Sequence, residues 1–236
     1  MTRPLDHITV VSLEHAIAAP LCTRHLADLG ARVIKVERPG SGDFARDYDR
    51  RARGLASHFV WVNRSKESLA LDLKQPEALA ALKALIDRAD VVVQNLAPGA
   101  TTRMGLDAAT WRAQNPRLIV CDISGYGQDG PYRDKKAYDL LIQSEAGMLS
   151  ITGTPEDPSK TGNSIADIAA SAPLLPALVP ERSMACSMLS VVRTPKMTGT
   201  PLSAPAAASP LVQAPATWSK CGVEPRMTAP SAMTAS

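Results

Sequence analysis

Three basic side chains stand where a phosphate-binding group would be useful. Arg38 ends a β-rich run and precedes the Gly/Ser-rich loop 39–43, Arg103 precedes a Met-Gly pair, and Lys136 precedes an apolar helical segment. An arginine in such a place can hold a phosphate through two parallel hydrogen bonds. We hypothesise that the three cations converge on one polyphosphate. The alternative for Arg38 is a solvated surface charge.

Two further features concern the ends of helices. Asp167 precedes the apolar run 168–170, and by position alone it suits a helix N-cap or an exposed surface site. The segment Glu14–Pro20 joins a strand-like run to a helix-like run, but it lacks the G-x-G-x-x-G fingerprint of dinucleotide-binding loops. In a doubly wound sheet such a loop still lies at the ligand-binding edge.

Alternating strands and helices must position these residues. Hydrophobic periodicity and turn residues predict strands at 7–13, 32–37, 68–73, 91–93 and 117–123. They predict helices at 20–29, 76–86 and 107–115, the second beginning at Pro76. Short connections between strands and helices indicate an α/β fold with a doubly wound, Rossmann-like sheet.

The amino-acid composition changes at about residue 171. The last 66 residues hold ten prolines and five of the eight methionines, and they contain no aspartate. Such a segment buries too little apolar area to offset its ordering entropy, so we expect a disordered Pro/Ala-rich tail. We therefore predict two parts, an α/β domain at 1–170 and a low-complexity segment at 171–236. A natural linker and an out-of-frame translation product both explain the second part, and the abrupt onset favours a frameshift.

Composition excludes several classes of protein. The net charge of +3 arises in the tail, because residues 1–170 hold 21 basic and 21 acidic side chains. No basic stripe is interleaved with aromatics, so nucleic-acid binding is not expected. No apolar run is long enough to span a membrane, and no apolar segment follows the N-terminal charge. The four cysteines form no metal-ligand spacing, so we expect reduced thiols, no metal and a cytoplasmic protein.

The order of many short motifs resembles the N-terminal part of family III CoA-transferases, the group of formyl-CoA and carnitine CoA-transferases, over about 170 residues. The motifs that carry this resemblance are Pro4-Leu5-Asp6, Ala27-Asp28-Leu29-Gly30-Ala31-Arg32-Val33-Ile34-Lys35-Val36-Glu37, Gly40-Ser41-Gly42-Asp43, Leu71-Asp72-Leu73-Lys74, Val93-Gln94-Asn95-Leu96-Ala97-Pro98-Gly99, Arg103-Met104-Gly105, Asn115-Pro116-Arg117-Leu118-Ile119, Gly125-Tyr126-Gly127-Gln128-Asp129-Gly130-Pro131, Ala137-Tyr138-Asp139 and Ser164-Ile165-Ala166-Asp167-Ile168-Ala169.

The resemblance implies roles for particular residues. It makes Asp167 the catalytic nucleophile, coenzyme A the bound group, and an interlocked homodimer the assembly. It implies that the nucleotide of CoA is bound by Ile17, Ala18, Arg38, Leu71, Asp72, Leu73, Lys74, Asn95, Leu96, Ala97, Arg103, Lys136, Ala137, Tyr138 and Asp139.

Two departures narrow the expected chemistry. Formyl-CoA transferases carry a glutamine where this chain has Ile17, so formyl or oxalyl transfer is not the expected reaction. Related acyl-CoA racemases carry a histidine where this chain has Tyr138. A tyrosine is a poor base at neutral pH because its free pKa is about 10, so racemisation is disfavoured.

The resemblance therefore predicts transfer of CoA between an acyl-CoA and a carboxylic acid through an aspartyl-CoA thioester. The segment 139–147 resembles members that act on small dicarboxylates such as succinate. The alternative is an inactive, truncated CoA-binding remnant, because family-like sequence stops just after Asp167 and the small second domain is missing. An acyl-CoA racemase is the least favoured reaction.

Overall fold

The computed structural model describes residues 3–172, and these form a parallel sheet covered on both faces. The five strands lie in the order β3-β2-β1-β4-β5, which is the strand order of a Rossmann fold. All neighbouring pairs are parallel, for example Val10 with Val33 and Val92 with Val120. The doubly wound α/β prediction is confirmed. The strand bounds are β1 Thr9–Leu13, β2 Arg32–Glu37, β3 Glu67–Ala70, β4 Val91–Gln94 and β5 Ile119–Asp122.

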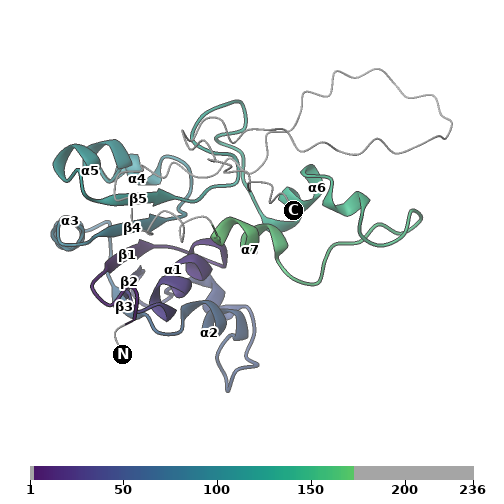
Figure 1. Ribbon diagram of the computed structural model, residues 1–236, viewed down its shortest axis with the longest axis horizontal. Coiled ribbons are helices and arrows are strands. Elements are labelled where there is room, and N and C mark those ends of the chain that lie inside the picture. The colour runs from purple at the N-terminus through teal and green to yellow at the C-terminus, as the bar shows by residue number, and fades with distance from the viewer. Residues whose placement is uncertain (1–2, 173–236) are drawn as a thin grey trace, which may run out of the picture. The chain divides into compact units, whose positions relative to one another are not determined.

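Helices flank this sheet on two sides (Figure 1). Helices α1, α2 and α7 lie on one side, and α3, α4 and α5 lie on the other. The helix bounds are α1 Ala18–Asp28, α2 Ser57–Asn63, α3 Pro76–Ile86, α4 Ala100–Arg103, α5 Ala108–Gln114, α6 Asp139–Glu145 and α7 Ile165–Ser171, with 3₁₀ turns η1 at Phe44–Asp47 and η2 at Met148–Ser150.

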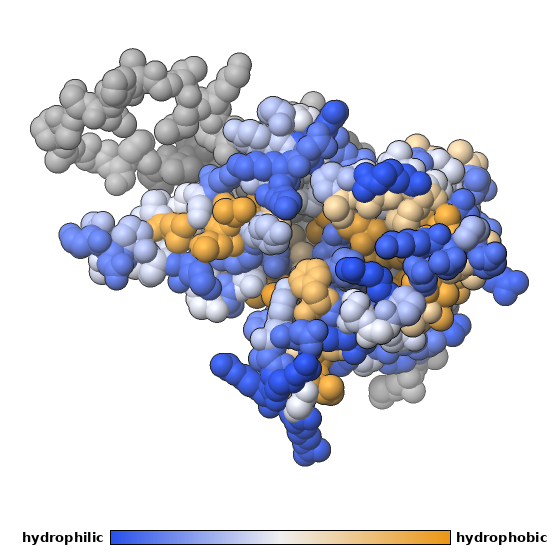
Figure 2. All heavy atoms as spheres, turned by 180° about the vertical axis from the view of Figure 1, so that it is seen from behind, coloured by the Kyte–Doolittle hydropathy of each residue, from blue (hydrophilic) through white to orange (hydrophobic). Residues whose placement is uncertain are grey.

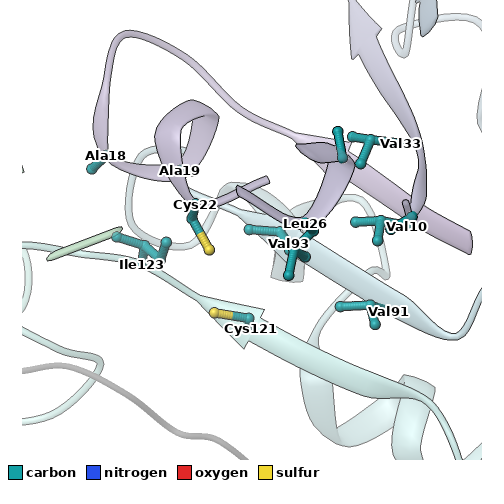
Figure 3. Packing of buried hydrophobic residues seen from close by; sticks show 12 residues of the cluster. Val10, Ala18, Ala19, Cys22, Leu26, Val33, Val91, Val93, Cys121 and Ile123 are labelled. Carbon is teal, nitrogen blue, oxygen red and sulfur yellow. The ribbon is translucent and has the colours of Figure 1, made fainter. Parts of the chain in front are cut away.

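The first core lies between the sheet and α1 (Figure 3). Alternate residues of the strands, such as Val10, Val33 and Val91, face Cys22 and Leu26 of the helix. Successive strand residues point to opposite faces, so only one residue in two belongs to this core. The helix predicted at 20–29 is confirmed as α1.

The second core covers the opposite face of the sheet. Val11, Val92 and Val120 pack there against Leu82 and Ile86 of α3, which are fully buried. A strand that is apolar on both sides, such as β4, is typical of a parallel sheet covered by helices. The two cores together fix the register of the strands because a one-residue slip would exchange the faces.

Helix boundaries follow their sequence signals closely at two places. Helix α3 begins at Pro76, whose missing N–H costs nothing in the first turn. Helix α5 is capped by Asp107, whose carboxylate accepts the N–H of Thr110 at 2.9 Å. Both helices therefore lie where the sequence predicts them.

Other boundaries differ from the prediction. The third strand is shorter than 68–73 and is exposed, because β3 is an edge strand that pairs only with β2. Helix α1 begins two residues before Pro20, which the first turn of a helix tolerates. Helix α2 was not predicted, because its residues are largely exposed and carry little apolar periodicity.

Some apolar surface of the described residues stays open to solvent. Figure 2 shows orange apolar patches among blue polar side chains on the face turned away in Figure 1. The large apolar side chains that are more than a third exposed include Phe44, Tyr48, Trp61, Leu140 and Ile151. Surface of this kind often marks an interaction site. The predicted disordered tail and the frameshift hypothesis concern 171–236, nearly all of which lies outside the described residues.

Candidate functional site

A pocket of about 300 Å³ opens at the carboxyl ends of the strands. The edge carries the residues that follow β1, β2, β3 and β4, because parallel strands end on the same side of a sheet. Six of the predicted nucleotide-binding residues line the pocket: Arg38, Leu71, Asp72, Leu73, Lys74 and Leu96. The remaining lining residues are Leu13, Glu14, His15, Val36, Glu37 and Met104.

The pocket is lined by apolar side chains and by charged side chains, some of which are already ion-paired. The apolar residues continue the second core, since Leu71, Leu73, Leu96 and Met104 pack against it. Glu37 is already paired with Arg46, at 2.8 and 2.9 Å from its two oxygens. Burial raises the pKa of Glu37, but the hydrogen bonds from Arg46 and from a backbone N–H outweigh burial and leave the pKa below its usual value.

Arg38 and Lys74 are exposed at the pocket and make no ion pair in the described part of the chain. The nearby carboxylate of Asp72 accepts the N–H of Lys74 and the side-chain amide of Gln75. An apolar floor with two available cations fits a flat ring bearing phosphates.

The loop between β1 and α1 borders this pocket and is held from two sides. Asn95 accepts the N–H of His15 at 2.8 Å and donates to its carbonyl at 2.9 Å. Asp43 accepts the N–H of Ala16 at 3.2 Å. Ala16 has φ +62°, a left-handed conformation that residues other than glycine rarely adopt. It persists only where the surrounding structure enforces it. Asn95 therefore holds the loop in place and does not itself line the pocket.

A buried ionic network supports the same loop. Lys66 donates to Glu14 at 2.8 Å, and Lys35 donates to Asp43 at 2.6 Å. Both cations also donate to the side-chain oxygen of Asn63 at 3.0 Å. The four ionic side chains are at most 2% exposed, and their formal charges cancel. Burial lowers the pKa of Lys66 to about 8, against the opposing attraction of Glu14.

Asp167 lies on the other side of the loop, in the first turn of α7. The interpretation of Asp167 as an N-cap is wrong, because Ser164 holds that position and Asp167 is the third residue of the helix. Burial, and then the negative charge of Asp139, raise the pKa of Asp167 to about 6. The carboxylate is therefore mostly ionised at neutral pH but held in an environment that disfavours its charge.

A row of neighbouring ring side chains and one apolar contact connect the pocket lining with the surroundings of Asp167. His15 lines the pocket, and its ring lies 5.6 Å from that of Phe44, which lies 5.9 Å from that of Tyr48. Burial, followed by the charges of Asp43 and Asp167, raises the pKa of Tyr48. Ile17, two residues after His15, packs with Ile168 of α7. The loop 15–17 thus separates the pocket from Asp167.

The predicted nucleotide-binding residues that do not line the pocket lie in three parts of the structure. Ile17 is the N-cap residue of α1 and Ala18 is its first residue, and both side chains are buried. Ala97 and Arg103 are exposed close to the pocket residues Leu96 and Met104. The segment 136–139 leads into α6, where Lys136 and Tyr138 are exposed and Asp139 contacts α7. The structure does not bring Arg103 or Lys136 into the pocket with Arg38.

Six of the twelve lining residues, including His15 and Met104, were not predicted from the sequence. His15 has a buried Nδ1 without a hydrogen-bond partner in the described region, and burial lowers its pKa. Met104 lies one residue after the predicted Arg103. The position of His15 two residues after a predicted strand was the available signal, because pocket residues of this fold follow strands.

Residues 3–172 contain neither a candidate metal site nor a candidate membrane-spanning helix. No group of three or more His, Cys, Asp or Glu side chains is arranged to hold a metal ion there. Within the same residues, no helix combines the length and apolar character needed to cross a bilayer.

Comparison with known proteins gives consistent matches to one family. The sequence matches the profile of CoA-transferase family III over residues 5–179. It is 42% identical to the succinate–glutarate CoA-transferase of Agrobacterium fabrum over 173 residues, which cover 70% of this chain and 43% of that protein. It is also 42% identical to the succinyl-CoA–D-citramalate CoA-transferase of Chloroflexus aurantiacus over 180 residues, which cover 75% of this chain and 45% of that protein.

A solved structure agrees with these sequence matches. The crystal structure of a hypothetical protein from Mycobacterium tuberculosis has 37% sequence identity and a TM-score of 0.68, and the match covers 75% of this chain and 49% of that one. The chain spans about half the length of the curated relatives that it matches. Because the family profile covers most of its length, the chain belongs to CoA-transferase family III.

Proposed function

We propose that the protein transfers coenzyme A between an acyl-CoA and a carboxylic acid, with Asp167 as the nucleophile. The observation that carries the proposal is the pairing of two features within a family III chain. One is the pocket with Arg38 and Lys74 at the carboxyl edge of the sheet, which suits the nucleotide of CoA. The other is the partly buried carboxylate of Asp167 across the loop 15–17.

In the proposed first half-reaction, a carboxylate oxygen of Asp167 attacks the thioester carbonyl. The C–S bond breaks and the CoA thiolate leaves, which gives a mixed anhydride of Asp167 and the acyl group. The thiolate then attacks the aspartyl carbonyl and releases the donor acid as a carboxylate. The product is a thioester between Asp167 and CoA.

The second half-reaction repeats these steps with the acceptor acid. The acceptor carboxylate attacks the aspartyl thioester and displaces CoA thiolate, and the thiolate attacks the acyl carbonyl of the new anhydride. Asp167 is regenerated and acyl-CoA leaves. A desolvated carboxylate is a stronger nucleophile than a hydrated one, and the raised pKa of about 6 still leaves it ionised at pH 7 to 8.

Small dicarboxylates are the proposed acids. The relatives from Agrobacterium fabrum and Chloroflexus aurantiacus carry names with succinate, glutarate, succinyl-CoA and D-citramalate. The apolar Ile17 also lacks the amide that formyl-CoA transferases carry at this position, which favours other acids over formate and oxalate. Succinyl-CoA is therefore the first donor to test.

Intact-mass spectrometry of the full chain mixed with succinyl-CoA tests the nucleophile. We expect a covalent species heavier than the protein by one CoA less one water. Asp167→Asn removes the attacking oxygen and abolishes this species. Asp157→Asn replaces an exposed aspartate of a nearby loop and leaves the species intact.

The alternative proposal, a CoA-binding remnant without turnover, predicts a different result. A folded chain that binds CoA in calorimetry but forms no covalent species with several acyl-CoA donors would replace our proposal with this alternative. A folded chain that does not bind CoA would contradict both.

We also propose that the protein forms a homodimer in the cytoplasm. The exposed apolar side chains of the described residues, such as Trp61 and Leu140, support the dimer because a second copy of the chain would bury them. Light scattering coupled to size-exclusion chromatography measures the mass in solution. A monomer at micromolar concentration would contradict the dimer.

A further inference from the structure

The first turn of α7, which carries Asp167, is not capped by its own N-terminal residue. Ser164 occupies the N-cap position, but its hydroxyl accepts no hydrogen bond from the helix. The N–H groups of Ala166 and Asp167 instead point to one oxygen of Asp139, at 2.9 and 3.4 Å. The N–H of Ile165 is bound to the carbonyl of Asn163 at 3.0 Å. A side chain from another helix therefore completes the turn that bears the proposed nucleophile.

Asp139 is itself held in place by a chain of partly buried hydrogen bonds. Its second oxygen accepts the side-chain amide of Gln143 at 2.6 Å, one turn along α6. Gln143 is only 2% exposed, and its carbonyl accepts the hydroxyl of Thr161 at 3.3 Å. Helices α6 and α7 pack against each other, so this chain spans their contact. Both oxygens of Asp139 have partners, and the carboxylate has a fixed orientation.

We propose that Asp139 is a positioning residue for Asp167: its carboxylate caps the first turn of α7 and fixes the backbone from which the carboxylate of Asp167 projects. This proposal rests on the proposed role of Asp167 as the nucleophile. It also changes the expected role of Asp139, which the family resemblance assigns to nucleotide binding. Asp139 does not line the pocket that holds Arg38 and Lys74.

Because residue 139 is an aspartate, its negative charge also acts on the carboxylate of Asp167. Asp139 is the one charged group whose field contributes to the raised pKa of Asp167 among the described residues, after burial. Tyr48 also faces Asp167, but as a neutral phenol with a raised pKa. Helix α1 contributes the apolar contacts of Ile17 and Leu21 through Ile168. The cap therefore both orders the helix and disfavours the charge on its neighbour.

Three substitutions separate these effects. Asp139→Asn keeps an oxygen acceptor for the N–H groups of α7 and removes the charge. Asp139→Ala removes both the acceptor and the charge. Glu156→Gln removes the charge of an exposed carboxylate between the two helices and is the matched control. Circular dichroism and thermal melting first establish that each full-length variant is folded.

The deciding measurements are made on the free protein by nuclear magnetic resonance. We expect the titration midpoint of the Asp167 carboxyl, about 6 in the parent protein, to fall in Asp139→Asn and to stay unchanged in Glu156→Gln. We expect amide exchange at Ala166 and Asp167 to accelerate about tenfold or more in Asp139→Ala. If Asp139→Ala does not fold, the midpoint in Asp139→Asn decides. An unchanged midpoint together with unchanged exchange would overturn the proposal.

Covalent capture by succinyl-CoA adds the functional test. We expect the rate of adduct formation on the ionised plateau of the pH profile to fall roughly tenfold to a hundredfold in Asp139→Ala, because small misplacements of a reacting group are costly. Asp139→Asn recovers part of the rate and shifts the profile to lower pH. If the parent protein forms no adduct, the proposed nucleophile fails, and the titration and exchange results still decide whether Asp139 positions Asp167.

Discussion

At the scale of single residues, the proposed nucleophile Asp167 is subject to two opposing demands. A nucleophile must be ionised, yet burial and the charge of Asp139 make ionisation unfavourable in the folded state. The raised pKa of Asp167 reflects this conflict. Shifted pKa values of this kind are concentrated at functional sites, and buried structural networks such as that of Lys66 also produce them.

The conflict predicts that Asp167→Asn stabilises the protein at neutral pH. The folded pKa of about 6 lies above the unfolded value of 3.8, so the folded state binds the proton more tightly. Stability from this proton is fully present below pH 3.8 and is lost as pH rises through about 6. The asparagine has no proton to lose, so at pH 8 we expect the variant to gain about 1–3 kcal/mol in the free energy of unfolding.

Urea unfolding at pH 8 and pH 5 measures this gain. The difference between the variant and the parent protein should shrink at the lower pH, where the folded carboxyl is largely protonated. Asp157→Asn, at an exposed position, serves as the control for charge removal. A variant that is less stable than the parent at both pH values would contradict the prediction.

At the scale of elements, the buried ionic network joins parts of the chain that are far apart in sequence. Glu14 follows β1, Lys35 belongs to β2, Asn63 ends α2, and Asp43 lies in the glycine-rich loop. These elements meet at the loop that carries Ala16 in its left-handed conformation. A network of this kind fixes a unique arrangement only while every member is satisfied.

We therefore expect Lys66→Met to destabilise the protein strongly. The substitution leaves the fully buried Glu14 with two partners, the hydroxyl of Thr23 and the longer ion pair to Lys35 at 3.9 Å. Loss of one partner of a buried ion pair typically costs about 3–5 kcal/mol, a large part of the stability of a domain.

Arg64→Met is the matched control for this prediction. Arg64 is a cation two residues away whose pair with Asp28 is exposed, and exposed pairs contribute little. Thermal melting of the two variants compares them directly. Equal melting temperatures would show that the network is dispensable.

At the scale of the whole described region, the carboxyl edge of the sheet brings together residues from four strand ends. Arg38, Lys74 and Leu96 come from three different connections and share one pocket only because the strands are parallel. The loop 15–17 then separates this pocket from α7, with His15 on the pocket side and Ile17 against Ile168. The fold thus sets a nucleotide-sized site and a carboxylate on two sides of one loop.

Binding of adenosine 3′,5′-bisphosphate, the nucleotide end of CoA, tests the pocket without any reaction. We expect Arg38→Ala to weaken binding about tenfold or more, since a hydrogen bond to a charged group contributes about 1.5–3 kcal/mol. Arg117→Ala is the control, because Arg117 is an exposed arginine that precedes β5, at the opposite edge of the sheet. Calorimetry measures both affinities, and equal losses in the two variants would contradict the assignment of the pocket.

Local signals in the sequence predict much of this fold for a clear reason. Pro76 marks a helix start through its fixed backbone and Asp107 through its capping carboxylate, and the short apolar run at 91–93 is typical of a strand buried on both faces. Helix α2 was not predicted, because its boundaries depend on contacts outside the helix. Asp49, eight residues earlier, accepts the N–H and hydroxyl of Ser57 at the start of the helix, and Asn63 at its end accepts a hydrogen bond from the distant Lys35.

The sequence by itself determined the alternation of strands and helices, the family to which the chain belongs, and the residue types available for chemistry. These follow from local periodicity and from motifs whose order survives without coordinates. The tertiary structure alone decided which of those residues meet. It placed Arg38 and Lys74 at one pocket, kept Lys136 out of its lining, and set Asp139 against α7. Contacts between residues far apart in sequence depend on packing, which no local pattern encodes.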